Sequence, residues 1–211
     1  MPNELRKEEN IHKTLEAGVR CFLRDGIERT QLLDVVAEAG VSKRSLLRYF
    51  KNKEKFVIAV LKFMGERQRE YGCQLYYADL PKDCTGLEAC KAYFAAVKQI
   101  FYEHPRYFSL LAEGELYLSH VQSQAAGVID NYLGNFTASA RSFQDLLEKG
   151  VKDGSITNLK NLDAKAGGVL CQSFFGMLIH LSLVYAMNIY SMEECVCIID
   201  KYIDSIMRNL R

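Results

Sequence analysis

The sequence lacks the motifs that usually mark an enzyme. It contains no Gly-rich phosphate-binding loop, no nucleophile elbow, no HExxH and no carboxylate pair at an informative spacing. Strand-type alternation of apolar and polar residues, internal repeats and low-complexity tracts are also missing. Only three prolines interrupt the 211 residues, of which 49% are hydrophobic. We therefore expect a compact all-α protein that is not an enzyme, and nothing in the sequence implies a cofactor.

The seven cysteines form no C-x-x-C pair, and the N-terminus carries no secretory signal peptide. An odd number of cysteines without an export signal indicates a cytoplasmic protein with free thiols. Cys73, Cys84 and Cys90 lie fairly close in sequence, which leaves a redox or metal sensor as an alternative. Because no histidine stands at ligand spacing from them, the favoured interpretation is inert packing and no metal site.

The longest stretch without a charged side chain is the 27 residues from Ala166 to Met192. A membrane span needs about 20 mainly apolar residues, so the length would suffice. However, no basic cluster flanks the stretch, and polar residues interrupt it. These are Gln172, Ser173, His180, Ser182 and Asn188. A helix buried by its own chain and by a partner subunit explains the stretch better, so we expect no membrane insertion.

Charge is unevenly distributed, although the net charge is only +1. Residues 1–62 carry 13 Lys and Arg against 9 Asp and Glu, a balance of +4, whereas residues 63–211 carry 14 against 17, a balance of −3. A local excess of positive charge is what a nucleic-acid-binding segment requires.

Residues 30–54, TQLLDVVAEAGVSKRSLLRYFKNKE, predict two short helices joined by a tight turn. Thr30 is a candidate N-cap of the first helix, and Gly40 ends it where a left-handed conformation is needed. Ser42 is the N-cap candidate of the second helix, which extends to about Phe50. The first helix has one apolar face, formed by Leu32, Val35, Val36 and Ala39.

The second helix of this pair is strongly basic. Leu46 and Phe50 are four residues apart and are expected to face the core. The remaining face carries Lys43, Arg44, Leu47 and Arg48. A helix of this width and charge fits the major groove of DNA. The alternative is an ordinary solvated basic helix, which we favour less because the surrounding residues also fit a DNA-binding pattern.

Helical periodicity continues through the rest of the chain. It predicts helices over about residues 8–24, 53 into the seventies, 86–104, a short one from Pro105, about 115–150, 164–188 and 191–209.

The run AGVSKRSLLRYFKNKE resembles the signature of the TetR/AcrR family of bacterial transcriptional regulators, whose usual form is close to AGVSKGTLYHYFPSKE. The similarity covers roughly residues 11–62. It implies an N-terminal three-helix helix-turn-helix DNA-binding domain, residues 1–52. It also implies a larger C-terminal helical domain for ligand binding and dimerisation, residues 53–211, with about nine helices in all.

The resemblance also assigns roles to single residues. Lys43, Arg44, Leu47 and Arg48 would contact DNA bases, and Thr30, Ser45, Tyr49 and Lys53 would contact phosphates. This chain has Arg44 where the family commonly has Gly and Leu47 where it commonly has Tyr, so the operator sequence should differ. Arg44 could form a bidentate hydrogen bond with a guanine edge.

In the family, the last two helices pair with their copies from a second subunit. Here they correspond to about residues 164–209, where Gly167, Gly168 and Gly176 would allow close approach. Such a two-fold dimer presents two recognition helices about 34–36 Å apart, so the double-stranded DNA operator should be palindromic.

The family's C-terminal domain encloses a cavity for a small, often hydrophobic molecule. An unknown hydrophobic or aromatic effector is therefore expected, because aromatic walls with a few polar groups are typical of such cavities. The alternative is that these are ordinary core residues. The candidate residues are Tyr71, Tyr93, Phe101, Tyr107, Phe108, Gln172 and His180.

The function expected from the sequence is a ligand-responsive repressor that binds a palindromic operator as a dimer and is released by a small molecule. The alternative is an architectural or partner-dependent DNA-binding factor that has no small-molecule effector.

Overall fold

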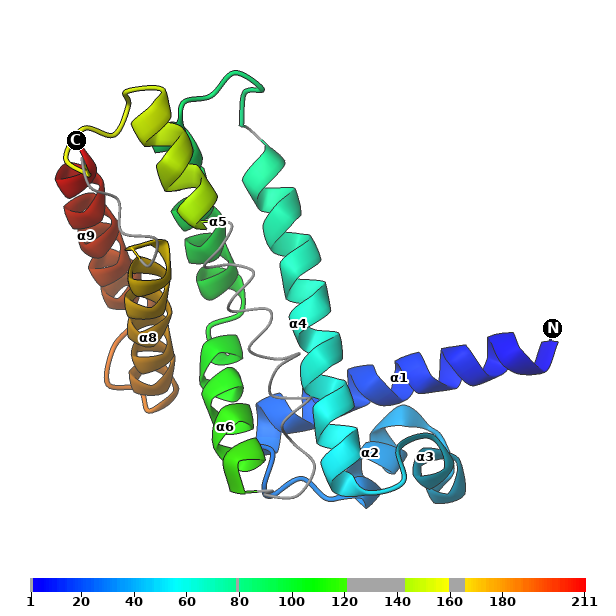
Figure 1. Cartoon of the computed structure of the whole chain (residues 1–211). Helices are drawn as coiled ribbons and strands as arrows, with labels where there is room; N and C mark the ends of the chain where they lie inside the picture. Colours follow the sequence, from blue (N-terminus) through cyan, green and yellow to red (C-terminus); the bar gives the residue numbers. More distant parts are fainter. Residues whose placement is uncertain (1, 79, 121–142, 160–165) are drawn as a thin grey trace. The chain divides into compact units, whose positions relative to one another are not determined.

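The computed structural model describes residues 2–78, 80–120, 143–159 and 166–211 (Figure 1). These residues form helices and connecting turns and include no strand, which confirms the predicted all-α class. The helices are α1 (Pro2–Asp25), α2 (Leu32–Ala39), α3 (Lys43–Phe50), α4 (Lys53–Ala78), α5 (Gly86–Glu103), α6 (Arg106–His120), α8 (Ala166–Ala186) and α9 (Met192–Leu210). Residues 143–152 are also helical.

The chain forms two compact units. Unit 1 comprises Met1–Arg67 and Leu110–Tyr132, and unit 2 comprises Gln68–Ser109 and Leu133–Arg211. Unit 1 thus contains the first part of α4 and the second part of α6 in addition to α1, α2 and α3. The sequence-based division into residues 1–52 and 53–211 stays a prediction.

The core of unit 1 is aromatic and joins α1, α3 and α4. The buried ring of Phe56 lies 5.1 Å from that of Phe50 and 6.0 Å from that of Phe22, measured between centroids. A Cβ on Gly18 would come within 2.6 Å of the Phe56 and Val60 side chains. Glycine is therefore required at this point of α1 for its close packing on α4.

Two local expectations for unit 1 are wrong. α1 begins at Pro2, earlier than about residue 8, and proline suits the first turn because its missing N–H would be unpaired there anyway. The N-cap of α2 is Gln31 and not Thr30, and the Gln31 N–H donates to the Asp34 carboxylate at 2.8 Å. The Ser42 cap is confirmed: Ser42 Oγ accepts from Ser45 N–H at 3.1 Å. Asn52 precedes α4, and its Oδ1 accepts from Lys55 N–H at 2.9 Å.

Unit 2 is built around a cluster of aromatic side chains. The ring of Phe94 on α5 lies 5.0 Å from that of Phe143 and 4.8 Å from that of Phe174 on α8. Phe174 also stacks on Tyr202 of α9 at 5.9 Å. At the edge of this core, Lys98 and Asp200 form an ion pair of 2.7 Å that joins α5 to α9.

The middle of the chain differs from the expected pattern. α6 continues as one helix from Arg106 to His120, whereas a short helix from Pro105 and a new one from about Glu115 were expected. Because Glu115 lies within an unbroken helix, no boundary falls there. The rest of the expected helix, between residues 121 and 142, lies outside the described residues.

α8 has one buried face and one uncovered face. Phe174, Leu178 and Leu181 are buried in the core of unit 2. Gly167–Ala186 is long and apolar enough to cross a membrane by length and composition alone, a test that the core helix of a soluble protein also passes. The uncovered face has no Asp, Glu, Lys or Arg and consists of Val169, Gln172, Ser173, Gly176, His180 and Leu183.

Candidate nucleic-acid interface

The basic face of α3 points to solvent because the opposite face is anchored in the core. Leu46 is completely buried and Phe50 almost so, as the sequence predicted. This orientation leaves Leu47 37% exposed. The charged side chains around it, Lys43, Arg44 and Arg48, are exposed as well. Gly40 ends α2 with φ +66°, in the left-handed region, and so sets the direction in which α3 starts.

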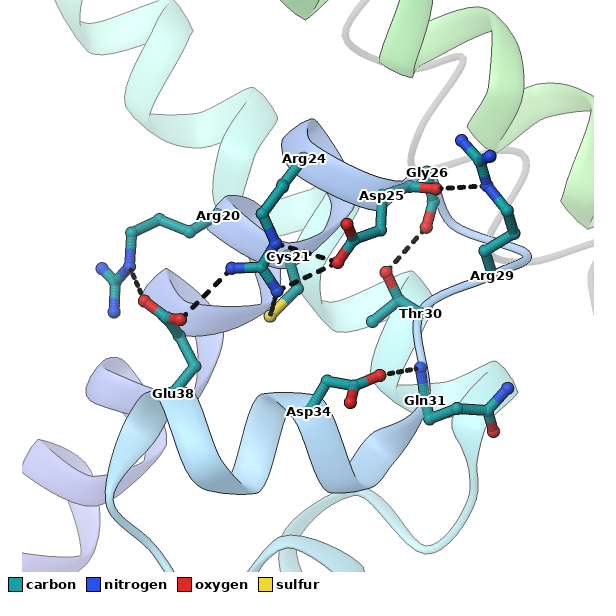
Figure 2. Close-up of polar contacts among 10 residues, drawn as sticks. All are labelled: Arg20, Cys21, Arg24, Asp25, Gly26, Arg29, Thr30, Gln31, Asp34 and Glu38. Carbon is teal, nitrogen blue, oxygen red and sulfur yellow. Dashed lines mark hydrogen bonds and ion pairs between the residues drawn. The ribbon is translucent and has the colours of Figure 1, made fainter.

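A polar network on the surface of unit 1 fixes α2 against α1 (Figure 2). The Glu38 carboxylate of α2 accepts from Arg20 Nε at 2.8 Å and from Arg24 at 3.4 Å, both on α1. The Arg20 hydrogen bond is the main reason that the pKa of Glu38 is lowered. Arg24 also pairs with Asp25 at 2.9 Å. Each exposed pair contributes little to stability alone, but together they restrict how α2 can rotate on α1.

Thr30, expected to contact a phosphate, is only 1% exposed. Its hydroxyl donates to the Gly26 carbonyl at 2.7 Å, so the side chain closes the turn between α1 and α2 (Figure 2). A phosphate contact by Thr30 stays a prediction, and it would require the hydroxyl to leave this bond.

Ser45 and Tyr49, the other expected phosphate contacts on α3, are both half-buried. Ser45 Oγ accepts from Ser42 Oγ at 3.0 Å. Arg48 donates to the Tyr49 hydroxyl at 3.1 Å, and its guanidinium lies 5.1 Å from the centre of the Tyr49 ring. The Arg48 hydrogen bond is the main cause that lowers the pKa of Tyr49, and a hydrogen bond with Asn10 of α1 adds to it. Arg48 is therefore brought together with Tyr49.

Lys53, at the start of α4, lies close to the turn between α1 and α2. Its ammonium donates to the Glu28 carbonyl at 2.7 Å. Burial lowers the pKa of Lys53, while the carboxylates of Glu28 and Glu113 act in the opposite direction. The structure thus places a positive charge at the N-terminus of a long helix, where the helix dipole also favours anions.

The residues expected to line an effector cavity do not form one group. Phe101 and Phe108 are buried, with ring centroids 5.8 Å apart, and Tyr107 follows beside them. Tyr71 hydrogen-bonds to Glu103, whereas the ring of Tyr93 lies 5.1 Å from that of Phe143. Two further candidates, Gln172 and His180, are on the uncovered face of α8 and so do not face these aromatics.

A hollow that the sequence did not predict lies at α5 and α9 in unit 2. It has a volume of about 320 Å³ and is lined by Lys91, Ile203, Asp204, Met207, Arg208 and Arg211. Arg208 and Arg211 are three residues apart at the end of the chain, which the sequence shows. That Lys91 of α5 joins them depends on tertiary packing and has no sequence signal.

Comparison with known proteins identifies the DNA-binding segment. Residues 15–60 match the model for bacterial regulatory proteins of the tetR family. These residues include the whole of α2 and α3 with their caps and the start of α4. The chain therefore carries the helix-turn-helix DNA-binding segment of the TetR family, as the resemblance of its signature implied. No curated protein sequence matches it.

Solved structures of bacterial regulators share the fold over nearly the whole chain. A TetR-family transcriptional regulator from Agrobacterium tumefaciens has a TM-score of 0.69 at 14% identity, covering 94% of this chain and 98% of that one. The regulator FadR from Bacillus subtilis, in complex with stearoyl-CoA, has a TM-score of 0.66 at 16% identity, covering 95% and 99%. A Clostridium perfringens protein described as a fatty acid metabolism regulator has a TM-score of 0.65 at 19% identity, covering 94% and 98%.

Proposed function

We propose that this regulator is a repressor that binds a palindromic operator as a homodimer and leaves it when a small hydrophobic molecule binds. The observation that carries the proposal is the exposed basic face of α3, held outward by the buried side chains of Leu46 and Phe50. A helix presented in this way can enter the major groove without any change in the core of unit 1.

The proposed DNA contacts fall into base contacts and phosphate contacts according to how exposed each side chain is. Lys43, Arg44 and Leu47 are exposed and face base edges, where Arg44 can bind guanine and Leu47 can contact a thymine methyl group. Arg48, held over Tyr49, can reach either a base or the backbone. Ser45, Tyr49 and Lys53 contact phosphates. Phosphate contacts position the protein on the duplex, and base contacts select the sequence.

The uncovered face of α8 is the surface on which the second subunit packs. A face without charged side chains is unusual on the surface of a monomer, and Val169 and Leu183 are 59% and 44% exposed on it. A Cβ on Gly168 or Gly176 would meet no atom within 4 Å, so both glycines leave space for a partner helix. Gly167 has a different role: its N–H donates to Gln144 at 2.7 Å within the same subunit.

A long-chain acyl-CoA is the effector class to test first. One of the compared structures is described as a fatty acid metabolism regulator, and another is bound to stearoyl-CoA. An effector can weaken DNA binding only if it binds one arrangement of the dimer better than another. α4, whose 26 residues follow α3 directly, is the part of the chain through which that difference is transmitted.

Binding of labelled duplex DNA, followed by fluorescence anisotropy, tests both parts of the proposal. The double variant Lys43→Ala/Arg44→Ala should lose binding, whereas Lys62→Ala, an exposed lysine on α4, should retain it. Stearoyl-CoA should then lower the affinity of the wild-type protein for its operator. Equally weakened binding in both variants would contradict the role of α3.

The tight packing of Phe101 and Phe108 favours one alternative, a DNA-binding factor without an effector. A thermal-shift series with acyl-CoA of increasing chain length separates the two possibilities, because a bound ligand raises the melting temperature. No shift at saturating concentrations, with unchanged operator affinity, would favour the effector-free factor for this ligand class.

A further inference from the structure

The hollow at α5 and α9 of unit 2 carries an excess of positive charge. Lys91 of α5 and Arg208 and Arg211 of α9 line it, and Asp204 is the one acidic side chain among the described residues of its lining. Its volume of about 320 Å³ lies within the range of small-molecule sites. The hollow is therefore large enough for an organic ligand, and its charge favours an anionic one.

The nearby acidic side chains do not neutralise this charge. Among the residues that the structure describes, no ion pair joins the three cations of the hollow to a carboxylate. The Glu88 carboxylate, one turn before Lys91 on α5, accepts instead from the N–H of Thr85 at 2.7 Å and from its hydroxyl at 2.8 Å. Arg208 Nε donates to the backbone carbonyl of Asp204 at 3.2 Å. The remaining donors of the cations are available to a ligand.

Elsewhere along the contact between α5 and α9, positive and negative charges are matched. Two turns after Lys91, Lys98 of α5 pairs with Asp200 of α9 at 2.7 Å. At the hollow, Lys91 is accompanied by arginines of α9. Arg208 and Arg211 are three residues apart, where like charges on a helix repel each other. The dipole of α9 explains why cations are favourable in its last turn, but it does not explain a third cation contributed by α5.

The end of α9 is held in place by the turn that contains Thr157. The Thr157 N–H donates to the Leu210 carbonyl at 3.1 Å, and the Thr157 hydroxyl donates to the Arg211 carbonyl. Ile203 and Met207 precede Arg211 by two turns and one turn of α9, and they form the apolar wall of the hollow. The hollow therefore combines an apolar wall with cations on a backbone that is held from outside α9.

We propose that this hollow binds an organic phosphate, a small molecule that joins a phosphate or diphosphate group to an uncharged part, as in a nucleotide. Guanidinium and ammonium groups donate charge-assisted hydrogen bonds to phosphate oxygens, and arginine can do so in a bidentate manner. The uncharged part would lie on Ile203 and Met207, and the Asp204 carboxylate can accept a hydrogen bond from a hydroxyl group. The inference goes beyond the proposed function, because this site requires neither DNA nor a second subunit.

NMR of the full-length protein, labelled with ¹³C at its methionine methyl groups, tests the inference. The chain has six methionines, of which Met207 lines the hollow, so the others serve as internal controls. Met207→Leu assigns the signal. ADP should shift the Met207 signal in a saturable manner, whereas adenosine, which lacks the phosphates, should not. Pyrophosphate, which lacks the uncharged part, should bind more weakly than ADP.

The double variant Arg208→Ala/Arg211→Ala should bind ADP at least about tenfold more weakly, because it loses charge-assisted hydrogen bonds to the phosphates. Lys201→Ala is the matched control, since Lys201 is an exposed lysine of α9 that does not line the hollow. It should bind ADP like wild type, and circular dichroism should show the wild-type helix content in both variants.

Three results would overturn the inference. ADP could leave the Met207 signal unmoved, or it could bind the double variant as tightly as wild type. Pyrophosphate could also bind as tightly as ADP, which would make the hollow a site for an adventitious ion only. Because no DNA is present in this experiment, each of these results would leave the proposed function standing.

Discussion

Glu113 of α6 accepts a hydrogen bond from the backbone N–H of Ile27 at 2.6 Å, although the two residues are 86 positions apart in the sequence. Ile27 lies in the turn between α1 and α2 and is completely buried. A Cβ on the preceding residue, Gly26, would lie 2.9 Å from the same carboxylate oxygen, and Gly26 has φ +84°. Within unit 1, a carboxylate of α6 therefore holds the turn from which the DNA-reading helices start.

Replacing Glu113 should destabilise unit 1. Glu113→Ala leaves the buried N–H of Ile27 without its acceptor, and we expect the unfolding free energy to fall by about 1–3 kcal/mol. Glu113→Gln retains an acceptor oxygen and should be destabilised less. Urea unfolding followed by circular dichroism measures both, with Glu70→Ala, an exposed carboxylate on α4, as the control. Equal midpoints for Glu113→Ala and Glu70→Ala would show that the bond contributes nothing.

Arg44 should determine the preference for one base pair. If it forms a bidentate bond with guanine, Arg44→Ala should weaken operator binding by about 1–3 kcal/mol and make the protein indifferent to the base at one position of each half-site. A comparison of wild type and variant on an operator series with single substitutions measures this. An unchanged preference at every position would exclude a base contact by Arg44.

Lys53 should contribute equally to the affinity for every DNA sequence. Lys53→Ala removes a cation at the start of α4 and should lower the salt slope by about 1 per subunit. Lys55→Ala, an exposed lysine on the same helix, is the control. Burial lowers the pKa of Lys53, so its ammonium loses its proton at a lower pH than the ammonium of an exposed lysine. As pH rises, the contribution of Lys53 to DNA affinity should therefore be lost before that of the exposed lysines. A sequence-selective decrease in affinity would contradict the phosphate role.

The recognition helix could be predicted from the sequence because its determinants are local. Gly40, Ser42, Leu46 and Phe50 lie within eleven residues, and each takes the place that its chemistry indicates. The start of α1 was missed for a related reason: its apolar stripe begins only at Ile11, and between Pro2 and Ile11 a single leucine, Leu5, among polar residues gives no periodic signal.

Contacts between distant parts of the chain could not be predicted. No local pattern indicates that Glu113 reaches Ile27 or that Lys53 binds the Glu28 carbonyl. Which face of α8 packs into the core could not be predicted either. Because both of its faces lack charge, the sequence does not distinguish the face in the core from the uncovered one, and Gln172 and His180 were assigned to an internal cavity although both are exposed.

A charge on the uncovered face of α8 should separate the subunits. Leu183→Glu places a carboxylate in the proposed interface, where it would be buried without a partner, so the sedimentation coefficient should fall to that of a monomer. Leu116→Glu, at an exposed leucine of α6, should leave the association unchanged. If both variants sediment like wild type, the subunits associate through another surface.

The cysteines should react with alkylating reagents according to their burial. Cys73 and Cys197 are exposed and should be modified in native protein, whereas Cys21, Cys84, Cys90, Cys171 and Cys195 are buried. Burial raises the pKa of Cys90 to about 12, so at pH 8 only about one molecule in ten thousand carries its thiolate. Mass spectrometry after iodoacetamide treatment measures the pattern. Rapid modification of Cys90 would show that the core of unit 2 opens.

Selection of bound sites from a pool of random duplexes tests the central claim most directly, namely that two copies of α3 read one operator. The account predicts an enriched sequence with two inverted half-sites whose centres are about 10–10.5 base pairs apart, or a multiple of this distance. Enrichment of a single asymmetric site, or of no site at all at low ionic strength, would contradict it.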